Sequence, residues 1–229
     1  MEIHQALIPQ SNTFLRPGIA MIPLYITVHN TGNTDAGANA AAHAQLLLNG
    51  GGGRQASWHY TVDDSDIWQH IPTDETAWHA GDGRGNGNMK SIGCEICENE
   101  DGDLTKAEDN AAWLIANLMQ QFNIPIENVV PHQKWSGKYC PDKILPHWGD
   151  FIAKIQAAYQ EVINPPIVPP TLPKGRKKPM MEQWLKDALI KSIQELAAKG
   201  KIGDPQLWIN KVNNDEDVAP LAIILINRL

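Results

Sequence analysis

The chain has 229 residues, 42% of them hydrophobic and 20% charged, which is the composition of a soluble globular protein with material for one or two domains. Its formal charge of −7 at pH 7 argues against a nucleic-acid binder. The charge is unevenly divided, because residues 1–170 hold 9 Lys and Arg against 19 Asp and Glu, whereas residues 171–229 hold 10 against 7. This asymmetry indicates an acidic module followed by a basic one that could approach an anionic surface.

Apolar periodicity and turn residues divide the first 163 residues into alternating strands and helices. The expected elements, in chain order, are a central strand at 24–30, a helix at 35–49 stopped by the glycines 50–53, a strand pair at 57–62 and 67–71, a long surface loop at 76–88, a strand at 91–97, a helix at 104–122, a short strand at 128–130 and a helix at 147–163. Strands interleaved with helices predict an α/β fold in which a mixed central sheet is flanked by helices.

The second part of the chain is expected to be separate. Residues 164–179 contain six prolines in sixteen positions and predict an extended linker. Its basic end is more typical of a solvated linker than of a binding patch. Helical spacing at 181–199, around Trp208, and at 219–229 then predicts a small all-α domain over 180–229, near the lower size limit for independent folding.

Three cysteines, Cys94, Cys97 and Cys140, do not make a disulfide framework. Cys94 and Cys97 are three apart on an expected strand and face opposite sides, which favours two buried residues over a zinc or redox pair. The first sixteen residues have no basic start followed by an apolar run, so we expect no secretory signal and synthesis in the cytoplasm. The longest late apolar run, 221–226, is too short for a transmembrane segment.

The stretch 131–141 carries the strongest chemical signal. His132 and Cys140 are good ligands for zinc, and Lys138 precedes the thiol by two residues, which in extended backbone points both side chains the same way. His29, at the end of the first strand, is a third candidate. Two histidines and one cysteine leave a fourth position open, as in catalytic zinc sites. Without other observations, a lone His and a distant Cys are more often core and surface residues.

Five motifs in order extend this signal. They are Ile26-Thr27-Val28-His29-Asn30-Thr31, Ser57-Trp58-His59-Tyr60, Ala77-Trp78-His79-Ala80-Gly81, Ser91-Ile92-Gly93-Cys94-Glu95-Ile96, and Pro131-His132 with Lys138-Tyr139-Cys140-Pro141. With them, residues from about 24 to about 159 resemble the zinc-dependent N-acetylmuramoyl-L-alanine amidases of the amidase-2 type, a group that includes phage endolysins, autolysins and peptidoglycan-recognition proteins.

The resemblance implies a role for each matched residue. His29, His132 and Cys140 would hold one Zn²⁺, Glu95 would be the catalytic carboxylate, and Lys138 would stabilise the transition state. The bland alternatives are an exposed strand carboxylate for Glu95 and a solvated loop residue for Lys138.

Candidate substrate-binding residues lie nearby. His79 sits in the loop that matches the family's substrate cleft. Asn30 and Asn88 are weaker candidates, because loop asparagines more often serve turns. Other histidines, at 43, 59, 70 and 147, are expected to be structural.

The implied activity is hydrolysis of the amide between N-acetylmuramic acid and L-alanine in peptidoglycan, by an endolysin that reaches the cell wall after release. The alternatives are a non-catalytic peptidoglycan-recognition protein, a bacterial autolysin or a cytoplasmic recycling amidase. By analogy with modular endolysins, the basic helical domain is expected to bind anionic wall polymers, with dimerisation as the rival interpretation.

Overall fold

The computed structural model describes residues 1–164, 183–200 and 202–214 of the chain. The chain divides into two compact units, residues 1–165 and 166–229. All of the predicted linker after residue 164 and the predicted helix at 219–229 lie outside the described residues.

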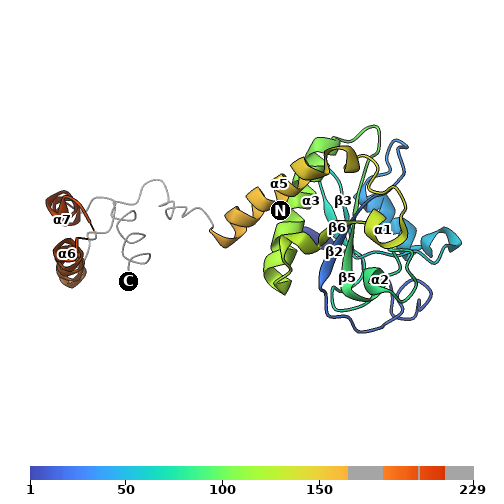
Figure 1. Ribbon diagram of the computed structural model, residues 1–229, viewed down its shortest axis with the longest axis horizontal. Helices are drawn as coiled ribbons and strands as arrows, with labels where there is room; N and C mark the ends of the chain where they lie inside the picture. Colours follow the sequence, from blue (N-terminus) through green and yellow to red (C-terminus); the bar gives the residue numbers. More distant parts are fainter. Residues whose placement is uncertain (165–182, 201, 215–229) are drawn as a thin grey trace. The chain divides into compact units, whose positions relative to one another are not determined.

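Six strands form one mixed sheet in the first unit, in the order β1-β4-β3-β5-β2-β6 (Figure 1). The strands are β1 (Ile3–Gln5), β2 (Tyr25–Asn30), β3 (Tyr60–Val62), β4 (Ile67–Gln69), β5 (Ser91–Ile96) and β6 (Val129–Pro131). Strands β3 and β4 pair antiparallel, and the other neighbours pair parallel. The mixed central sheet expected from the sequence is confirmed, and β1 is an addition to it.

Helices cover both faces of this sheet, with α3 and α5 on one side and α1 and α2 on the other (Figure 1). The helices of the first unit are α1 (Ala40–Leu48), α2 (Asn86–Lys90), α3 (Leu104–Phe122), α4 (Gln133–Ser136) and α5 (Trp148–Ile163), with 3₁₀ turns at Gly51–Gly53, Ile126–Asn128 and Leu145–His147. Helix α3 has the predicted bounds, and it begins where the Asp103 carboxylate accepts the backbone N–H of Lys106.

Helix α1 begins five residues later than predicted. Gly37 has φ = 78°, a left-handed conformation that a right-handed helix does not contain. Asn39 then caps the helix, because its side-chain oxygen accepts the N–H of Ala42 at 3.0 Å. The prediction of a start at Asp35 was therefore wrong.

The two faces of the central strands differ in chemistry. Ile26 and Val28 of β2 and Ile92 and Cys94 of β5 are fully buried in the main core, together with side chains of α3 and α5 such as Phe151. Side chains alternate along a strand, so the intervening residues of β2 and β5 point to the opposite face. Those intervening residues include the candidate site residues His29 and Glu95. Cys94 and Cys97 are buried free thiols, as predicted.

The segment 76–88 was predicted to be a surface loop, and this holds only for its middle part, because most of residues 81–86 are exposed whereas residues 76–80 and 87–88 are mostly buried. Thr76, Ala77 and Ala80 are fully buried, and the last three residues belong to α2. A buried loop needs partners for its backbone groups. Here Ser57 exchanges hydrogen bonds with Trp78, donating its N–H to the Trp78 carbonyl at 3.0 Å and accepting the Trp78 N–H on its hydroxyl at 3.1 Å.

The second unit contains α6 (Gln183–Ala198) and α7 (Pro205–Asn213). The two helices pack through Ile193 and Val212, which are fully buried. Apolar side chains of both helices and of the turn between them pack against this pair, namely Leu189, Ile190, Ile202, Trp208 and Ile209. Among the residues described, we find no helix with the length and apolar character that crossing a membrane requires.

Candidate metal centre

The candidate site lies where three parallel strands end. Strand β2 pairs with β5 and β6 on its two sides, and the register sets His29 opposite Glu95. Strand β6 leads directly into His132, and the chain returns after α4 to Cys140. Because the carboxyl ends of parallel strands meet at one edge of a sheet, residues far apart in sequence converge here.

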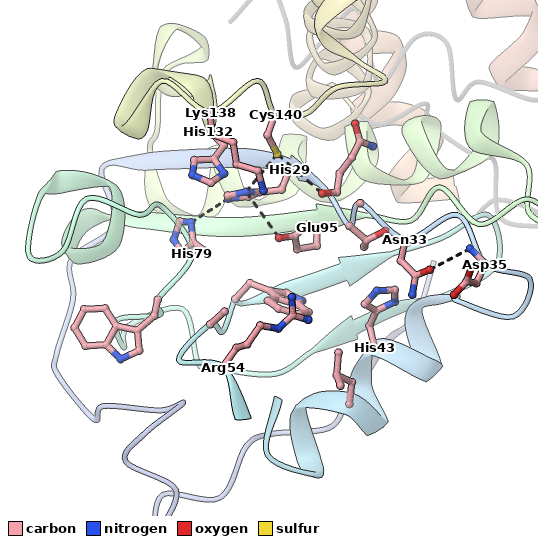
Figure 2. A pocket seen from close by; sticks show the side chains of 17 residues that line it. His29, Asn33, Asp35, His43, Arg54, His79, Glu95, His132, Lys138 and Cys140 are labelled. Atoms are coloured by element: carbon pink, nitrogen blue, oxygen red, sulfur yellow. Dashed lines mark hydrogen bonds and ion pairs between the residues drawn. The ribbon is translucent and has the colours of Figure 1, made fainter. Parts of the chain in front are cut away.

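His29, His132 and Cys140 are all buried, and each offers a ligand atom within 4.8 Å of the others (Figure 2). The Cys140 Sγ lies 3.9 Å from His29 Nδ1, and the centroids of the two imidazole rings are 4.6 Å apart. This is the trio expected from the sequence, and the fold brings it together.

Hydrogen bonds at the far side of each ring leave the Nδ1 atoms available. His132 Nε2 lies 3.0 Å from the Ala80 carbonyl oxygen and 3.0 Å from the Ser136 hydroxyl, while its Nδ1 is buried and has no partner among the described residues. His29 Nε2 lies 3.0 Å from His79 Nδ1. A carbonyl can only accept, so the His132 proton is on Nε2 and its lone pair is on Nδ1.

Burial sets the protonation state of each of the three candidate ligands. Burial lowers the pKa of His29 well below its usual value, with the neighbouring His79 and His132 adding to the effect, and burial also lowers the pKa of His132. Both imidazoles are therefore neutral donors. Burial raises the pKa of the Cys140 thiol to about 11, so a bound cation would have to displace its proton. Two neutral imidazoles, a thiol and an unpartnered buried nitrogen fit a zinc ion.

Glu95 stands beside this trio on β5. Its Oε1 is 3.8 Å from His29 Nδ1, and its Oε2 is buried with no hydrogen-bond partner. Burial raises the pKa of the carboxyl to about 8, against the opposing effect of the Lys138 ammonium. A carboxyl with a pKa near neutrality can both take and return a proton.

A cleft of about 430 Å³ opens over these groups, and Lys138 lines it with Glu95 (Figure 2). Sequence reasoning did not single out Asn33, Asp35 and Arg54, which also line the cleft. Arg54 and His43 lie on the side away from Cys140 and Lys138 (Figure 2). Nothing in a single exposed Arg after a glycine run identifies it as a cleft residue, since its place depends on how the turn Gly51–Gly53 packs against α1.

The three candidate substrate-binding residues are engaged inside the protein. His79 and Asn30 line the cleft, whereas Asn88 lines an adjoining cavity of about 360 Å³. Asn30 accepts the Lys143 N–H at 3.0 Å and donates to the Ile96 carbonyl at 3.4 Å. Their role in substrate binding stays a prediction.

The remaining histidines make hydrogen bonds within the fold. His59 donates to the Glu75 carbonyl at 2.8 Å, and His70 lies 2.8 Å from the Thr61 hydroxyl. His43 lies 2.9 Å from the Asn39 carbonyl, and His147 lies 2.9 Å from the Glu108 carboxylate. The structural role expected for them stays the simplest interpretation, although His43 also reaches the cleft.

Known proteins resemble this chain over the first unit. The sequence profile described as N-acetylmuramoyl-L-alanine amidase matches residues 20–143. The chain is 57% identical over 157 residues to the N-acetylmuramoyl-L-alanine amidase CwlH of Bacillus subtilis (strain 168), covering 68% of this chain and 62% of CwlH. It is 61% identical over 140 residues to the N-acetylmuramoyl-L-alanine amidase XlyA of the same organism, covering 61% of this chain and 46% of XlyA.

Solved structures agree with these sequence matches. The structure of the catalytic domain of XlyA superposes with a TM-score of 0.65 and 57% identity, covering 68% of this chain and 99% of that domain. A mutant endolysin from Bacillus subtilis superposes equally well, with a TM-score of 0.65, 57% identity and the same coverage of 68% and 99%. The chain thus spans less than two thirds of each of the two amidases, 62% of CwlH and 46% of XlyA, and nearly all of the solved catalytic domains.

Proposed function

This chain belongs to the N-acetylmuramoyl-L-alanine amidase family of the amidase-2 type, and from that kinship we propose that it hydrolyses the amide bond between N-acetylmuramic acid and L-alanine in peptidoglycan. We propose further that the reaction depends on one zinc ion held by His29, His132 and Cys140.

One observation carries the proposal more than any other. Three buried donors converge within 4.8 Å of one another, and the Glu95 carboxylate stands 3.8 Å from one of them at the floor of an open cleft. A recognition protein needs neither a cluster of metal donors nor a buried carboxyl without a partner. Metal-assisted amide hydrolysis uses both.

The residues divide the chemistry among them. Zinc, when bound, supplies Lewis acidity, which polarises a carbonyl and makes water a better nucleophile. Glu95 takes a proton from the attacking water at its unpartnered Oε2 and returns it to the amide nitrogen as the C–N bond breaks. The Lys138 ammonium faces the negative charge that develops on the carbonyl oxygen, an interaction strongest in the transition state.

Product analysis tests the bond that is cut. Purified peptidoglycan is digested with and without a chelator, and soluble products are identified by mass spectrometry. We expect free stem peptides beginning with L-alanine, lost on chelation and restored by zinc. New reducing sugars, or cuts inside the peptide, would contradict the proposed bond. Wall that is bound but not cut would favour a recognition protein.

Two substitutions test the residue roles. Glu95→Gln removes the base, and we expect turnover to fall by about 10²–10⁴ while zinc stays bound. Lys138→Met is expected to cost about 10²–10³. Lys134→Met is the matched control, because Lys134 is an exposed lysine of the same region whose ammonium lies over the Tyr25 and Trp135 rings and does not line the cleft. Full turnover in either test variant would remove that residue from the mechanism.

For the whole chain, we propose an endolysin that acts on the bacterial cell wall after its release from the cytoplasm. The similarity to an endolysin of Bacillus subtilis supports this. The second unit would hold the enzyme on anionic wall polymers, consistent with the excess of Lys and Arg in residues 171–229. If so, the full chain should sediment with purified walls and residues 1–164 should not. Equal sedimentation, with a dimer seen only for the full chain by light scattering, would favour dimerisation instead.

A further inference from the structure

Two consecutive residues, His79 and Ala80, each contact one of the two candidate histidine ligands at its Nε2, the ring nitrogen that does not face the metal site. The His79 Nδ1 lies 3.0 Å from His29 Nε2, and the Ala80 carbonyl oxygen lies 3.0 Å from His132 Nε2. His29 lies in β2 and His132 directly follows β6, so this short segment is the element that contacts both.

The direction of each hydrogen bond can be worked out from the acceptors. His79 Nε2 lies 3.2 Å from the Ser91 carbonyl oxygen, which can only accept, so His79 carries its proton on Nε2. Its Nδ1 is then an acceptor, and the proton between the two rings belongs to His29 Nε2. This leaves the His29 lone pair on Nδ1, the atom that lies 3.9 Å from the Cys140 sulfur.

A buried amide holds the segment in place. The Asn88 side-chain oxygen accepts the backbone N–H groups of both His79 and Ala80, each at 2.8 Å. The Asn88 side-chain nitrogen donates to the Gly83 carbonyl at 2.9 Å, and the residue is 3% exposed. One amide oxygen therefore fixes the positions of both the His79 and the Ala80 backbone, and with them the His79 ring and the Ala80 carbonyl.

The His79 ring packs against the backbone of strand β5. A Cβ placed on Gly93 would come within 2.7 Å of His79 Cγ and 2.9 Å of His79 Nδ1, so the imidazole lies directly against the backbone of that strand. The ring is thus fixed from three directions, by Gly93, by the Ser91 carbonyl and by its own clamped backbone. A ring fixed in this way has little freedom to reach for a substrate.

We propose that His79 and Asn88 are positioning residues for the metal site: His79 orients His29, and Asn88 holds the segment that orients both His29 and His132. The inference rests on the proposed zinc amidase function and assigns to these residues a role other than substrate contact. Partners of this kind behind a metal-bound histidine fix its tautomer, and their loss typically weakens metal binding by about 10–100-fold.

The test compares two side chains of nearly equal size at position 79 in the full chain. His79→Asn keeps an oxygen acceptor at the position of Nδ1, whereas His79→Leu has no acceptor there. Zinc affinity is measured by competition with a chromophoric chelator, and KM and kcat are measured separately. We expect His79→Leu to bind zinc about 10–100-fold more weakly and His79→Asn to stay within about threefold of the parent.

His70 provides the control for simple damage to the core. It is fully buried and bonds to Thr61, and among the described residues no hydrogen bond joins it to a candidate ligand. His70→Leu should lower the melting temperature and leave the zinc affinity of the folded protein unchanged. Asn88→Leu should weaken zinc binding even though Asn88 itself contacts neither ligand.

The outcomes separate the inference from the function beneath it. If the parent binds zinc and His79→Leu binds it equally well, the positioning role is wrong. A raised KM in that variant would then return His79 to substrate binding. A parent that binds no zinc would overturn the proposed function and the inference together.

Discussion

Replacing Gly93 by alanine would place a methyl group against the His79 imidazole. The added carbon would lie 2.7 Å from His79 Cγ and 2.8 Å from Cδ2, whereas ordinary contacts begin near 3.4 Å. Gly93 lies within strand β5 and does not have a positive φ, so the backbone itself accepts alanine. The substitution is therefore a test of one contact only, that between the strand and the ring.

The size of the effect follows from the geometry. The ring must retreat by several tenths of an ångström, but Asn88 holds its backbone and its Nδ1 lies 3.0 Å from His29 Nε2. Inserting a carbon into a packed interior typically costs about 1–3 kcal/mol. At about 2 kcal/mol, the melting temperature of a unit of this size should fall by about 4–8 °C. Displacement of the ring should also lengthen its 3.0 Å contact with His29, so zinc affinity should fall as well.

Thermal melts and zinc competition on the same samples measure both effects. Gly149→Ala is the matched control, because Gly149 lies in the first turn of α5 and a Cβ there would meet nothing within 4 Å. That change should stabilise the protein by about 0.5–1 kcal/mol and leave zinc binding unaltered. If Gly93→Ala melts like the parent and binds zinc equally well, the His79 ring does not pack against this strand as described. The strand would then play no part in positioning His29.

Acid should destabilise the metal-free protein, because burial lowers the pKa of His59 to about 4 and of His70 to about 3, below the ordinary 6.5. The unfolded chain takes up these protons first, so the free energy of unfolding should fall as the pH drops from about 6.5 towards 4, by up to about 1.4 kcal/mol per pH unit for each group. Urea titrations at pH 7 and pH 5 measure this fall, and His70→Asn should reduce the dependence of the free energy of unfolding on pH. A free energy of unfolding independent of pH would mean that these rings are not buried and neutral. Removing zinc with a chelator should lower the melting temperature of the first unit, since a ligand at a thousand times its Kd adds about 4 kcal/mol to stability; an unchanged melt would count against a resident metal. A chain ending at Asn164 should keep the melting temperature of the first unit and cut soluble peptidoglycan fragments to the same products, and loss of either would mean that the second unit completes the first.

Local signals in the sequence were enough to predict most of the longer helices and strands, but not the short ones. Helix α3 was predicted with its observed bounds because a long apolar stripe runs from a capping aspartate to Asn123, whose φ of 53° ends the helix. The short strand β1 carries no such signal in three residues, and it exists because β4 offers it a parallel partner. Helix α1 was placed too early because alanines continue a helical pattern through a glycine that turns the backbone the other way.

The residues of the candidate site likewise divide into those that the sequence could identify and those that only the fold reveals. The three donors and Glu95 could be named because their residue types and flanking motifs are chemically distinctive. The Ala80 carbonyl could not, since every residue has a carbonyl and only the tertiary fold selects the one that meets His132. Burial of both ends of the segment 76–88 was missed for a related reason: its polar composition suggests exposure, but Asn88 and Ser57 satisfy its backbone groups inside the protein.

His29 and Glu95 occupy one rung of the ladder between β2 and β5, and that pairing has a consequence for how the enzyme can change. A slip of one residue would turn both side chains to the opposite face, so selection on activity also holds the register of the sheet. The connections that follow these strands, residues 31–38 and 98–102, lie outside the paired strands and exclude the caps Asn39 and Asp103. Their length and composition can vary while the rung keeps its spacing. A designer could therefore exchange the first connection, which carries the cleft residues Asn33 and Asp35, between relatives to alter what enters the cleft without changing the paired strands.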